Sequence, residues 1–255
     1  MSARLELIPL GNFPLVEPGQ NVAHLIAASL EENGLMLMQG DVLVVAQKII
    51  SKAEDCYVRL ADITPSPEAV ALAEAADKDP RQMELVLRES REVVRVRPGV
   101  VVVEHRNGYV HANAGIDKSN IPTSEVDPQV LLLPQNPDAS ALGLHDVLSR
   151  YSGIEIPIII NDSAGRAWRN GTVGIAIGTA GFEPLYNQVG ERDLYGNILE
   201  VTEAAVADEL AAAASLVMGQ AAQACPVVLA RGVSFQASSA GSRSLIRDKA
   251  QDMFR

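Results

Sequence analysis

Asp41-Val42-Leu43-Val44-Val45-Ala46 is an apolar run of strand length that follows Gly40 and leads directly into Gln47-Lys48-Ile49-Ile50-Ser51-Lys52. A short, continuous apolar run bounded by a turn residue is typical of a strand that is buried in the core. Lysines that follow such a strand are suitably placed to meet phosphate oxygens as point charges. Solvated lysine side chains are the alternative, because most lysines lie at the surface.

Strand-like and helix-like segments surround this run without strict alternation. Asn107-Gly108 is a hairpin signal between two apolar segments. Further strands are expected at Leu5–Leu10, Val93–Val96, Val100–Glu104, Tyr109–Ala112, Ile156–Ile160, Val173–Ile177 and Pro226–Ala230, and helices at Val22–Glu32, Glu68–Lys78, Asp79–Ser90, Ala139–Tyr151 and Val201–Met218. This order favours an α+β fold with mixed sheets and hairpins over a doubly wound sheet.

The 255 residues suffice for one large domain or two of moderate size. Thr64-Pro65-Ser66-Pro67 is a clear break, and a second candidate boundary lies near Tyr195–Val201. We therefore expect two intimately packed α+β subdomains. The first would comprise residues 1–66 plus about 200–255, and the second about 67–199.

Composition excludes several classes of function. The formal charge of −11 argues against a nucleic-acid partner, which would require a basic patch. No apolar run is long enough to cross a membrane, and the N-terminus does not resemble a signal peptide. Cys56 and Cys225 match no zinc or redox spacing, so we expect buried, reduced thiols in a cytoplasmic protein.

Two polar motifs point to chemistry. Ala112-Asn113-Ala114-Gly115-Ile116-Asp117-Lys118-Ser119-Asn120 and Asn161-Asp162-Ser163-Ala164-Gly165-Arg166-Ala167-Trp168 each follow an apolar, strand-like run. Each motif combines a carboxylate with glycine and with hydroxyl or amide groups, which suits Mg²⁺ or Mn²⁺ bound together with phosphate. In the alternative interpretation, the same residues only cap turns or helices.

Common nucleotide and hydrolase motifs are missing. The chain has no Walker-type loop, no Gly-x-Gly-x-x-Gly, no His-Glu-x-x-His and no Gly-x-Ser-x-Gly. The four histidines, His24, His105, His111 and His145, show no metal-ligand spacing. From the residues alone, the nucleotide and the reaction therefore stay open.

The chain resembles the coenzyme F-420-0:γ-glutamyl ligase family along nearly its whole length. The resemblance is carried, in order, by Asp41–Glu54, Leu87–Ser90, Ala112–Asn120, Leu133–Asp138, Asn161–Trp168, Val173–Gly178, Asp193–Gly196 and Arg231-Gly232. It implies an enzyme that uses GTP and divalent metal to join L-glutamate to the deazaflavin coenzyme F-420-0. It also implies a homodimer with nucleotide sites near an intertwined interface.

The resemblance assigns a role to each candidate site residue. The metal ligands would be Asp117, Asp162, Ser163 and Gln220, and the catalytic residues Asp117, Asp162 and Lys52. The nucleotide contacts would be Phe13, Pro14, Leu15, Val16, Gln47, Lys48, Lys52, Asn120, Met218, Gly219 and Gln220. Gln220 would be a weaker metal ligand than a carboxylate, and the Phe13 loop has a plain buried turn as its alternative.

The implied chemistry is carboxylate–amine ligation. Transfer of the γ-phosphoryl group of GTP would convert the acceptor carboxylate into an acyl phosphate, which the glutamate amine then attacks. Further glutamates would be added through γ-linkages. Two Mg²⁺ or Mn²⁺ ions would align the transfer, and a need for K⁺ stays open. No residue in the motifs stands out as a general base.

Arg166 and Arg169 flank Trp168 at the end of the second motif. Arginines at this position could bind a substrate phosphodiester or carboxylates in a bidentate manner. The alternative is a surface turn in which Trp168 packs against the edge of the core.

Two other functions remain as alternatives. The first is a related ligase that acts on a different acid, which the departures from the family pattern at Gln135, Ala164 and Ala167 would allow. The second is a non-catalytic regulatory module that binds metal or nucleotide. Retention of both Asp117 and Asp162 argues against the regulatory module.

Overall fold

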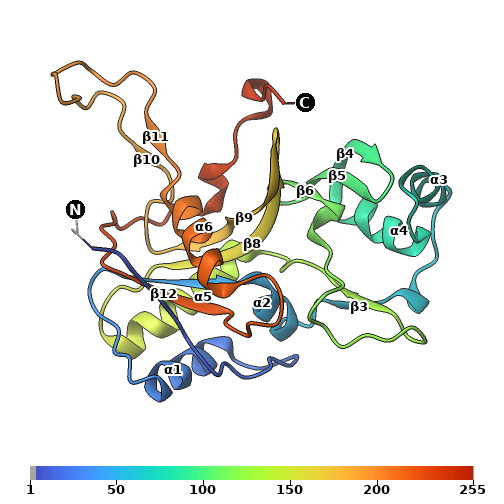
Figure 1. The fold of residues 1–255 in the computed structure, drawn as a ribbon, viewed down its shortest axis with the longest axis horizontal. Helices are drawn as coiled ribbons and strands as arrows, with labels where there is room; N and C mark the ends of the chain where they lie inside the picture. Colours follow the sequence, from blue (N-terminus) through green and yellow to red (C-terminus); the bar gives the residue numbers. More distant parts are fainter. Residues whose placement is uncertain (1–3, 255) are drawn as a thin grey trace.

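The computed structural model describes residues 4–254 and contains a five-stranded sheet (Figure 1). Its strands lie in the order β1 (Glu6–Pro9), β12 (Val227–Arg231), β2 (Asp41–Ala46), β8 (Ile158–Arg166) and β9 (Arg169–Ala180). Only β2 and β8 are parallel, whereas the other neighbours are antiparallel. The predicted buried strand is thus confirmed as the middle strand, and the mixed sheet confirms the α+β class.

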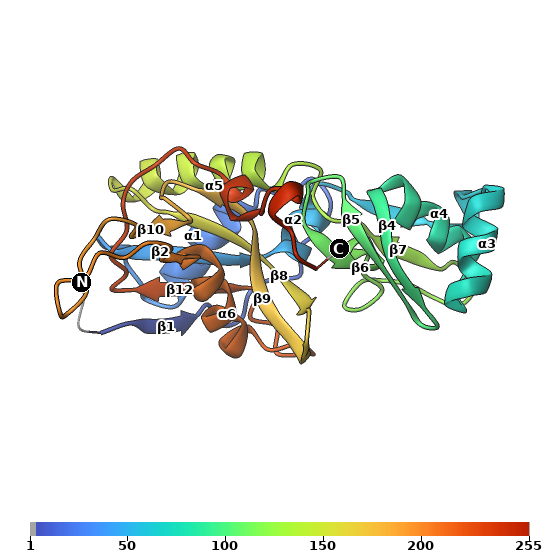
Figure 2. The ribbon, with the colours of Figure 1, turned by 90° about the horizontal axis from the view of Figure 1, so that it is seen from above.

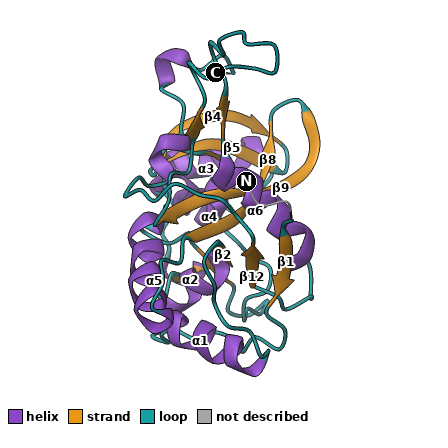
Figure 3. Cartoon of the chain, turned by 90° about the vertical axis from the view of Figure 1, so that its left-hand side faces the viewer, coloured by secondary structure: helices purple, strands orange, loops and turns teal. Residues whose placement is uncertain are grey.

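Helices cover both faces of this sheet (Figure 2 and Figure 3). Leu43 and Val45 of β2 belong to the core beneath α1 (Val22–Glu32) and α5 (Pro137–Ser152), whereas Val42 and Val44 belong to the core beneath α6 (Val206–Met218). Side chains alternate between the two faces of a strand. A strand covered on both sides therefore requires apolar residues throughout, which explains the run at β2.

A smaller lobe, residues 57–131, extends to one side of the sheet (Figure 2). Its elements are β3 (Tyr57–Arg59), η1 (Leu60–Asp62), α3 (Pro67–Ala76), α4 (Pro80–Arg88), β4 (Ser90–Arg97), β5 (Val100–His105), β6 (Val110–Ala112), η2 (Asn113–Gly115) and β7 (Gln129–Leu131). The lobe has one sheet of β4, β5 and β6, a second of β3 and β7, and its own apolar core.

The large sheet draws strands from both of the predicted subdomains. β2 comes from residues 1–66, whereas β8 and β9 come from the range of about 67–199. The division into subdomains stays a prediction, but hydrogen bonding between β2 and β8 joins its two parts in one sheet.

Several predicted boundaries need correction. The strand expected at Ile156–Ile160 is β8, which runs to Arg166 because its polar half pairs with β9 in a hairpin. The helix expected at Val201–Met218 begins only at Val206. The preceding residues belong instead to a projecting arm with the short strands β10 (Tyr186–Asn187) and β11 (Glu203–Ala204) (Figure 1).

Most helix starts follow from local sequence. Asn21, Ser66, Asp79 and Asn136 each accept a hydrogen bond from a backbone N–H in the first turn, and proline opens α3, α4 and α5. The predicted helix start at Asp79-Pro80 is thereby confirmed.

Within residues 4–254, no helix combines the length and apolar character needed to span a bilayer. The C-terminal segment contains η3 (Ser242–Leu245) and η4 (Lys249–Gln251).

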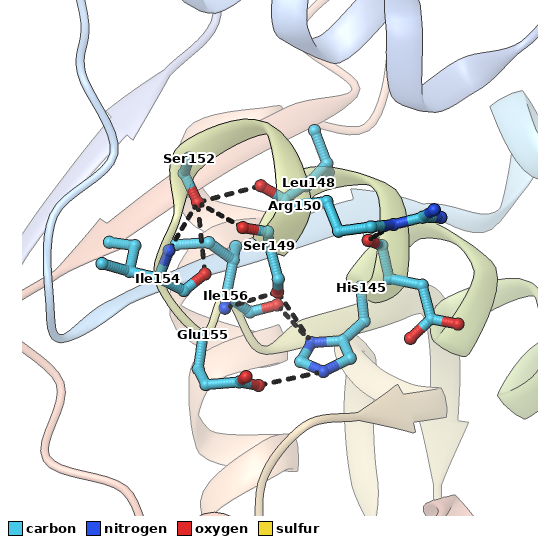
Figure 4. A network of polar contacts seen from close by, with 9 residues as sticks. His145, Leu148, Ser149, Arg150, Ser152, Ile154, Glu155 and Ile156 are labelled. Carbon is cyan, nitrogen blue, oxygen red and sulfur yellow. Dashed lines mark hydrogen bonds and ion pairs between the residues drawn. The ribbon is translucent and has the colours of Figure 1, made fainter.

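A polar network fastens the end of α5 to the segment before β8 (Figure 4). His145 Nδ1 lies 2.8 Å from the Ile156 carbonyl oxygen, so this nitrogen must carry the proton and donate it. Ser149 Oγ accepts from the Ile156 N–H at 3.0 Å, and His145 Nε2 lies 3.2 Å from Glu155 Oε2. Because Nδ1 is a donor, it cannot take a proton from Ser149. The network is therefore structural rather than a nucleophile–histidine pair.

Replacing Gly174 by alanine is expected to lower the free energy of unfolding by about 1–3 kcal/mol, the usual cost of overpacking. A Cβ atom at Gly174 would lie 2.2 Å from Ser215 Oγ and 2.4 Å from the Ala211 carbonyl oxygen, so α6 would have to shift away from β9. Urea unfolding measures the loss. Gly165→Ala on β8, where a Cβ meets nothing within 4 Å, serves as the control, and equal losses would contradict the packing explanation.

Candidate active site

The parallel pair β2 and β8 brings two distant segments to one edge of the sheet. Ala46 is in register with Asn161, so Gln47 and Asp162 follow at the same end of the two strands. In open sheets, ligands bind at the carboxyl ends of parallel strands. Helix α2 (Gln47–Ala53) begins directly after β2, while Asp162 and Ser163 lie within β8 and not in a turn after it.

The first polar motif reaches the same edge from the smaller lobe. Directly after β6, Asn113, Ala114 and Gly115 have φ values of 51°, 54° and 68°, so the chain reverses within three residues. A Cβ at Gly115 would lie 2.6 Å from Leu133 Cδ1, which favours glycine there. Asp117 then exchanges two backbone hydrogen bonds of 2.9 Å with Leu131, and these fix its position.

The Asp117 carboxylate is held by residues of α2. Lys48 Nζ lies 2.5 Å from Asp117 Oδ2, and Gln47 Nε2 donates to the same oxygen at 2.7 Å. Ser51 Oγ fixes Gln47 by donating to its Oε1 at 2.9 Å. Burial raises the pKa of the Asp117 carboxyl, an effect that the Lys48 charge opposes and the Asp162 charge reinforces. A cation beside both carboxylates would relieve this repulsion.

The Asp162 side of the site is completed by β6 and by the segment after α6. His111 Nε2 lies 3.2 Å from Asp162 Oδ2. Ser163 Oγ donates to Gln220 Oε1 at 2.9 Å. Asn120 Nδ2 donates to the Ala221 carbonyl at 3.1 Å. These contacts join the two polar motifs to residues 219–221, which are far away in sequence.

One cavity of about 1220 Å³ lies between these segments. Every residue that sequence assigned to metal, nucleotide or catalysis lines it, namely Phe13, Pro14, Leu15, Val16, Gln47, Lys48, Lys52, Asp117, Asn120, Asp162, Ser163, Met218, Gly219 and Gln220. Small-molecule sites usually measure about 300–1,000 Å³, so this cavity has room for more than one ligand. The individual roles of these residues stay predictions.

The arginines of the second motif lie elsewhere. Neither Arg166 nor Arg169 lines the cavity, and Arg166 Nη1 donates to the Gly171 carbonyl within the hairpin of β8 and β9. Trp168 is 86% exposed and faces Phe254 at a ring-centroid distance of 6.3 Å. The interpretation that Trp168 packs against the core edge is therefore wrong.

His111 and Asn161 are polar residues of the cavity wall to which sequence reasoning gave no role. His111 is buried and faces Asp162, and its only sequence signal is its place directly before the first motif. Asn161 is buried at the end of the apolar part of β8 and donates to Ser215 Oγ at 3.0 Å. Its Oδ1 has no hydrogen-bond partner among residues 4–254. Neither contact follows from spacing, because both partners lie on other elements.

The donor set fits a hard divalent cation bound together with a ligand. Among the described residues, no cluster of three or more His, Cys, Asp and Glu side chains could hold a metal on its own. The carboxylates of Asp117 and Asp162, with the oxygens of Ser163 and Gln220, are hard donors around one cavity. Mg²⁺ is commonly bound by one or two carboxylates, with substrate phosphates supplying other ligands. The residues present thus suit Mg²⁺ or Mn²⁺ held jointly with a phosphate.

Both cysteines are free, as predicted, but half-buried rather than buried. Cys56 follows α2, and its N–H donates to the Ser51 carbonyl at 2.9 Å. Burial and, to a smaller extent, the charges of Glu54, Glu89 and Asp55 together raise the pKa of the Cys56 thiol to about 11.

Cys56 is therefore expected to be alkylated slowly. At pH 8 a thiol with a pKa of about 11 is about 0.1% thiolate, roughly a hundredfold less than a thiol with the ordinary pKa of 9.0. The alkylation rate should rise about tenfold per pH unit between pH 8 and 10, because only the thiolate reacts. Mass spectrometry of a Cys225→Ser variant with iodoacetamide measures it, with the urea-unfolded chain as control. If Cys56 were alkylated at the same rate in the folded and the unfolded chain, its pKa would not be raised by the fold.

The fold is of the α+β class, and the large cavity at the end of its parallel strand pair is the kind of site in which an enzyme of this class would bind small molecules. The family model described as F420-0:Gamma-glutamyl ligase matches residues 11–232. The chain belongs to this family, and it is therefore a ligase that forms a peptide-type bond.

Named relatives match the chain from end to end. It is 46% identical over 253 residues to the Coenzyme F420:L-glutamate ligase of Methanothermobacter thermautotrophicus, covering 98% of this chain and 99% of that protein. The enzyme of the same name from Methanopyrus kandleri is 43% identical over 99% of this chain and 97% of its own length. That of Methanocaldococcus jannaschii is 39% identical over the same shares.

Proposed function

We propose that this chain is a GTP-dependent ligase that joins L-glutamate to the carboxylate of coenzyme F420-0 and then adds further γ-linked glutamate. The observation that carries the proposal is the meeting of Asp117, Asp162, Lys48 and Lys52, from three separate segments, around one cavity. The relatives named Coenzyme F420:L-glutamate ligase support the identity of the acceptor and of the amino acid.

The proposed reaction has two steps. A carboxylate oxygen of the acceptor attacks the γ-phosphorus of GTP, the bond to the bridging oxygen breaks, and GDP leaves. The glutamate amine then attacks the carbonyl carbon of the acyl phosphate. Inorganic phosphate leaves with the electron pair of the broken C–O bond, and the amine loses a proton. The divalent ion would neutralise charge on the phosphate oxygens.

The two cavity lysines have different tasks in this proposal. Lys48 is paired with Asp117 and helps to hold that carboxylate in place. Lys52 has no carboxylate partner within the described part of the chain, so its charge can face a phosphate. Burial lowers the pKa of the Lys52 ammonium, and the charge of Lys48 lowers it further. An incoming phosphate would offset both effects, which favours anion binding here.

Turnover with mass spectrometry tests the proposal. The purified protein is incubated with F420-0, L-glutamate, GTP and Mn²⁺, and the product should gain the mass of one or more glutamyl units. The gain should vanish in Asp162→Ala and when ATP replaces GTP. No gain from a protein that calorimetry shows to bind GTP and Mn²⁺ would rule out this acceptor, and no binding of either would rule out the ligase mechanism.

The departures from the family pattern are not among the residues that line the cavity. Gln135, Ala164 and Ala167 do not contribute to its lining. They therefore provide no support for a different acid acceptor, the alternative that their sequence positions had allowed.

We also propose a homodimer. In the arm between β10 and β11, Leu194 is 100% exposed and Tyr195 is 91% exposed. Large apolar side chains that lie together at the surface are typical of protein–protein interfaces. Light scattering should give twice 27.2 kDa for the wild type. A Leu194→Ser, Tyr195→Ser double variant should shift toward 27.2 kDa. A wild-type mass of 27.2 kDa would contradict the dimer.

A cytoplasmic location stays a prediction.

A further inference from the structure

We propose that His111 is a positioning residue whose imidazole orients the Asp162 carboxylate toward a divalent cation. The inference rests on the proposed function, because the cation belongs to the proposed ligase site. It assigns Asp162 Oδ2 to His111 and leaves Oδ1 for the cation.

The contact joins the large sheet to the three-stranded sheet of the smaller lobe. His111 is the central residue of β6 and pairs with Val103 of β5, so its backbone belongs to the sheet of the smaller lobe. Asp162 lies on β8 of the large sheet, and β6 runs close to β8 (Figure 1). A side-chain contact between sheets can set the orientation of Asp162 relative to Asp117, because Asp117 follows β6 in the chain.

Aromatic packing holds the imidazole in place. The Tyr109 ring meets the His111 ring edge-on at a centroid distance of 5.8 Å and stacks on His105 at 4.9 Å. Asn107 Nδ2 donates to the Tyr109 hydroxyl at 3.1 Å, and the Asn107 N–H donates to His105 Nδ1 at 3.0 Å. Asn107 thus holds both Tyr109 and His105 in place, and the fixed Tyr109 ring limits rotation of the His111 ring.

The Asp162 carboxylate is the available acceptor for His111. Nε2 has almost no exposed surface, so it is not open to a metal ion, and it has no aligned hydrogen-bond partner among residues 4–254. Asp162 Oδ2 lies at hydrogen-bonding distance, 3.2 Å, but out of line with the N–H. A buried donor without an aligned acceptor costs free energy. A small rotation of the Asp162 carboxyl would align Oδ2 with the N–H and remove that cost, and Oδ1 would remain for the cation.

Calorimetry of Mn²⁺ binding in the presence of GTP tests this role. Replacing a hydrogen-bond partner of a metal ligand usually costs about 10–100-fold in metal affinity. We expect this loss in His111→Leu and recovery of most of it in His111→Gln, whose amide retains an N–H donor. His24→Leu is the matched control, since His24 is exposed on α1. His111→Leu and His111→Gln should have equal melting temperatures and equal affinities for GTP without metal, so that a difference between them in Mn²⁺ affinity reports on the lost N–H donor.

Three outcomes would overturn the inference. The first is wild-type Mn²⁺ affinity in a folded His111→Leu variant. The second is an equal loss in the leucine and glutamine variants together with a lowered melting temperature, which would indicate packing alone. The third outcome is a wild-type protein that binds no Mn²⁺ with GTP. This result would overturn the proposed function as well, whereas the first two outcomes leave that function intact.

If His111→Leu does not fold, His111→Met replaces it under the same criteria.

Discussion

Replacing Asp117 or Asp162 by alanine is expected to lower the turnover of glutamate addition by about 10³-fold or more, since each change removes a carboxylate from the proposed divalent-cation site. Asp117 is held by Lys48 and Gln47, and the Asp162 charge acts on it across the cavity. Without either carboxylate, the ion would no longer be placed against the phosphate being transferred, and repulsion between the anionic substrates would go uncompensated.

Steady-state turnover at saturating GTP, glutamate and F420-0 measures the effect, with Mn²⁺ varied over a wide range. Asp127→Ala is the control, because Asp127 is an exposed carboxylate of the smaller lobe that pairs with Arg59 and lies outside the cavity. We expect the control to keep wild-type turnover. If either active-site variant retained more than a tenth of wild-type turnover, that carboxylate would not hold a catalytic ion.

Replacing Arg231 by leucine is expected to lower the free energy of unfolding by about 3–5 kcal/mol, the usual cost of removing one partner of a buried ion pair. Asp41 is 0% exposed at the start of β2, and Arg231 lies opposite it on β12. The guanidinium donates to both carboxylate oxygens at 2.9 Å and to the Met36 carbonyl at 2.7 Å. Leucine would leave the Asp41 charge buried without its partner.

Urea unfolding of the purified variants measures this loss. Arg59→Leu is the matched control, because the Arg59–Asp127 pair leaves its side chains 56% and 49% exposed and should contribute less than about 1 kcal/mol. Adding Asp41→Asn to Arg231→Leu should restore part of the stability by removing the unpaired charge. Equal losses for the two arginine variants would show that the buried pair does not stabilise the sheet.

The elements with strong local signals were predictable. The helix at Val22–Glu32 and the strand at Asp41–Ala46 have the predicted ends, because apolar spacing and the flanking residues act over a few positions. β8 was predicted too short. Its second half, including Asp162 and Ser163, is polar and becomes a strand only by pairing with β9.

Some site residues could be predicted from local sequence, whereas others depend on contacts between distant segments. Asp117, Asp162 and Ser163 lie in motifs whose composition marks them, and the resemblance to the ligase family predicts that all three are metal ligands. His111 lies one residue before the first of these motifs, yet nothing in its spacing distinguishes it from the other histidines. Its importance depends on the approach of β6 to β8, which local sequence does not specify.

By itself, the sequence determined the α+β class, the middle strand and the composition of both polar motifs, because these depend on propensities and patterns within short segments. Only the tertiary structure decided how the site is assembled. Gln47 meets Asp117 across 70 positions, and Ser163 meets Gln220 across 57. Such contacts arise from the parallel pairing of β2 with β8 and from packing of the smaller lobe against that edge. Both are set by burial of the whole chain and not by any local run of residues.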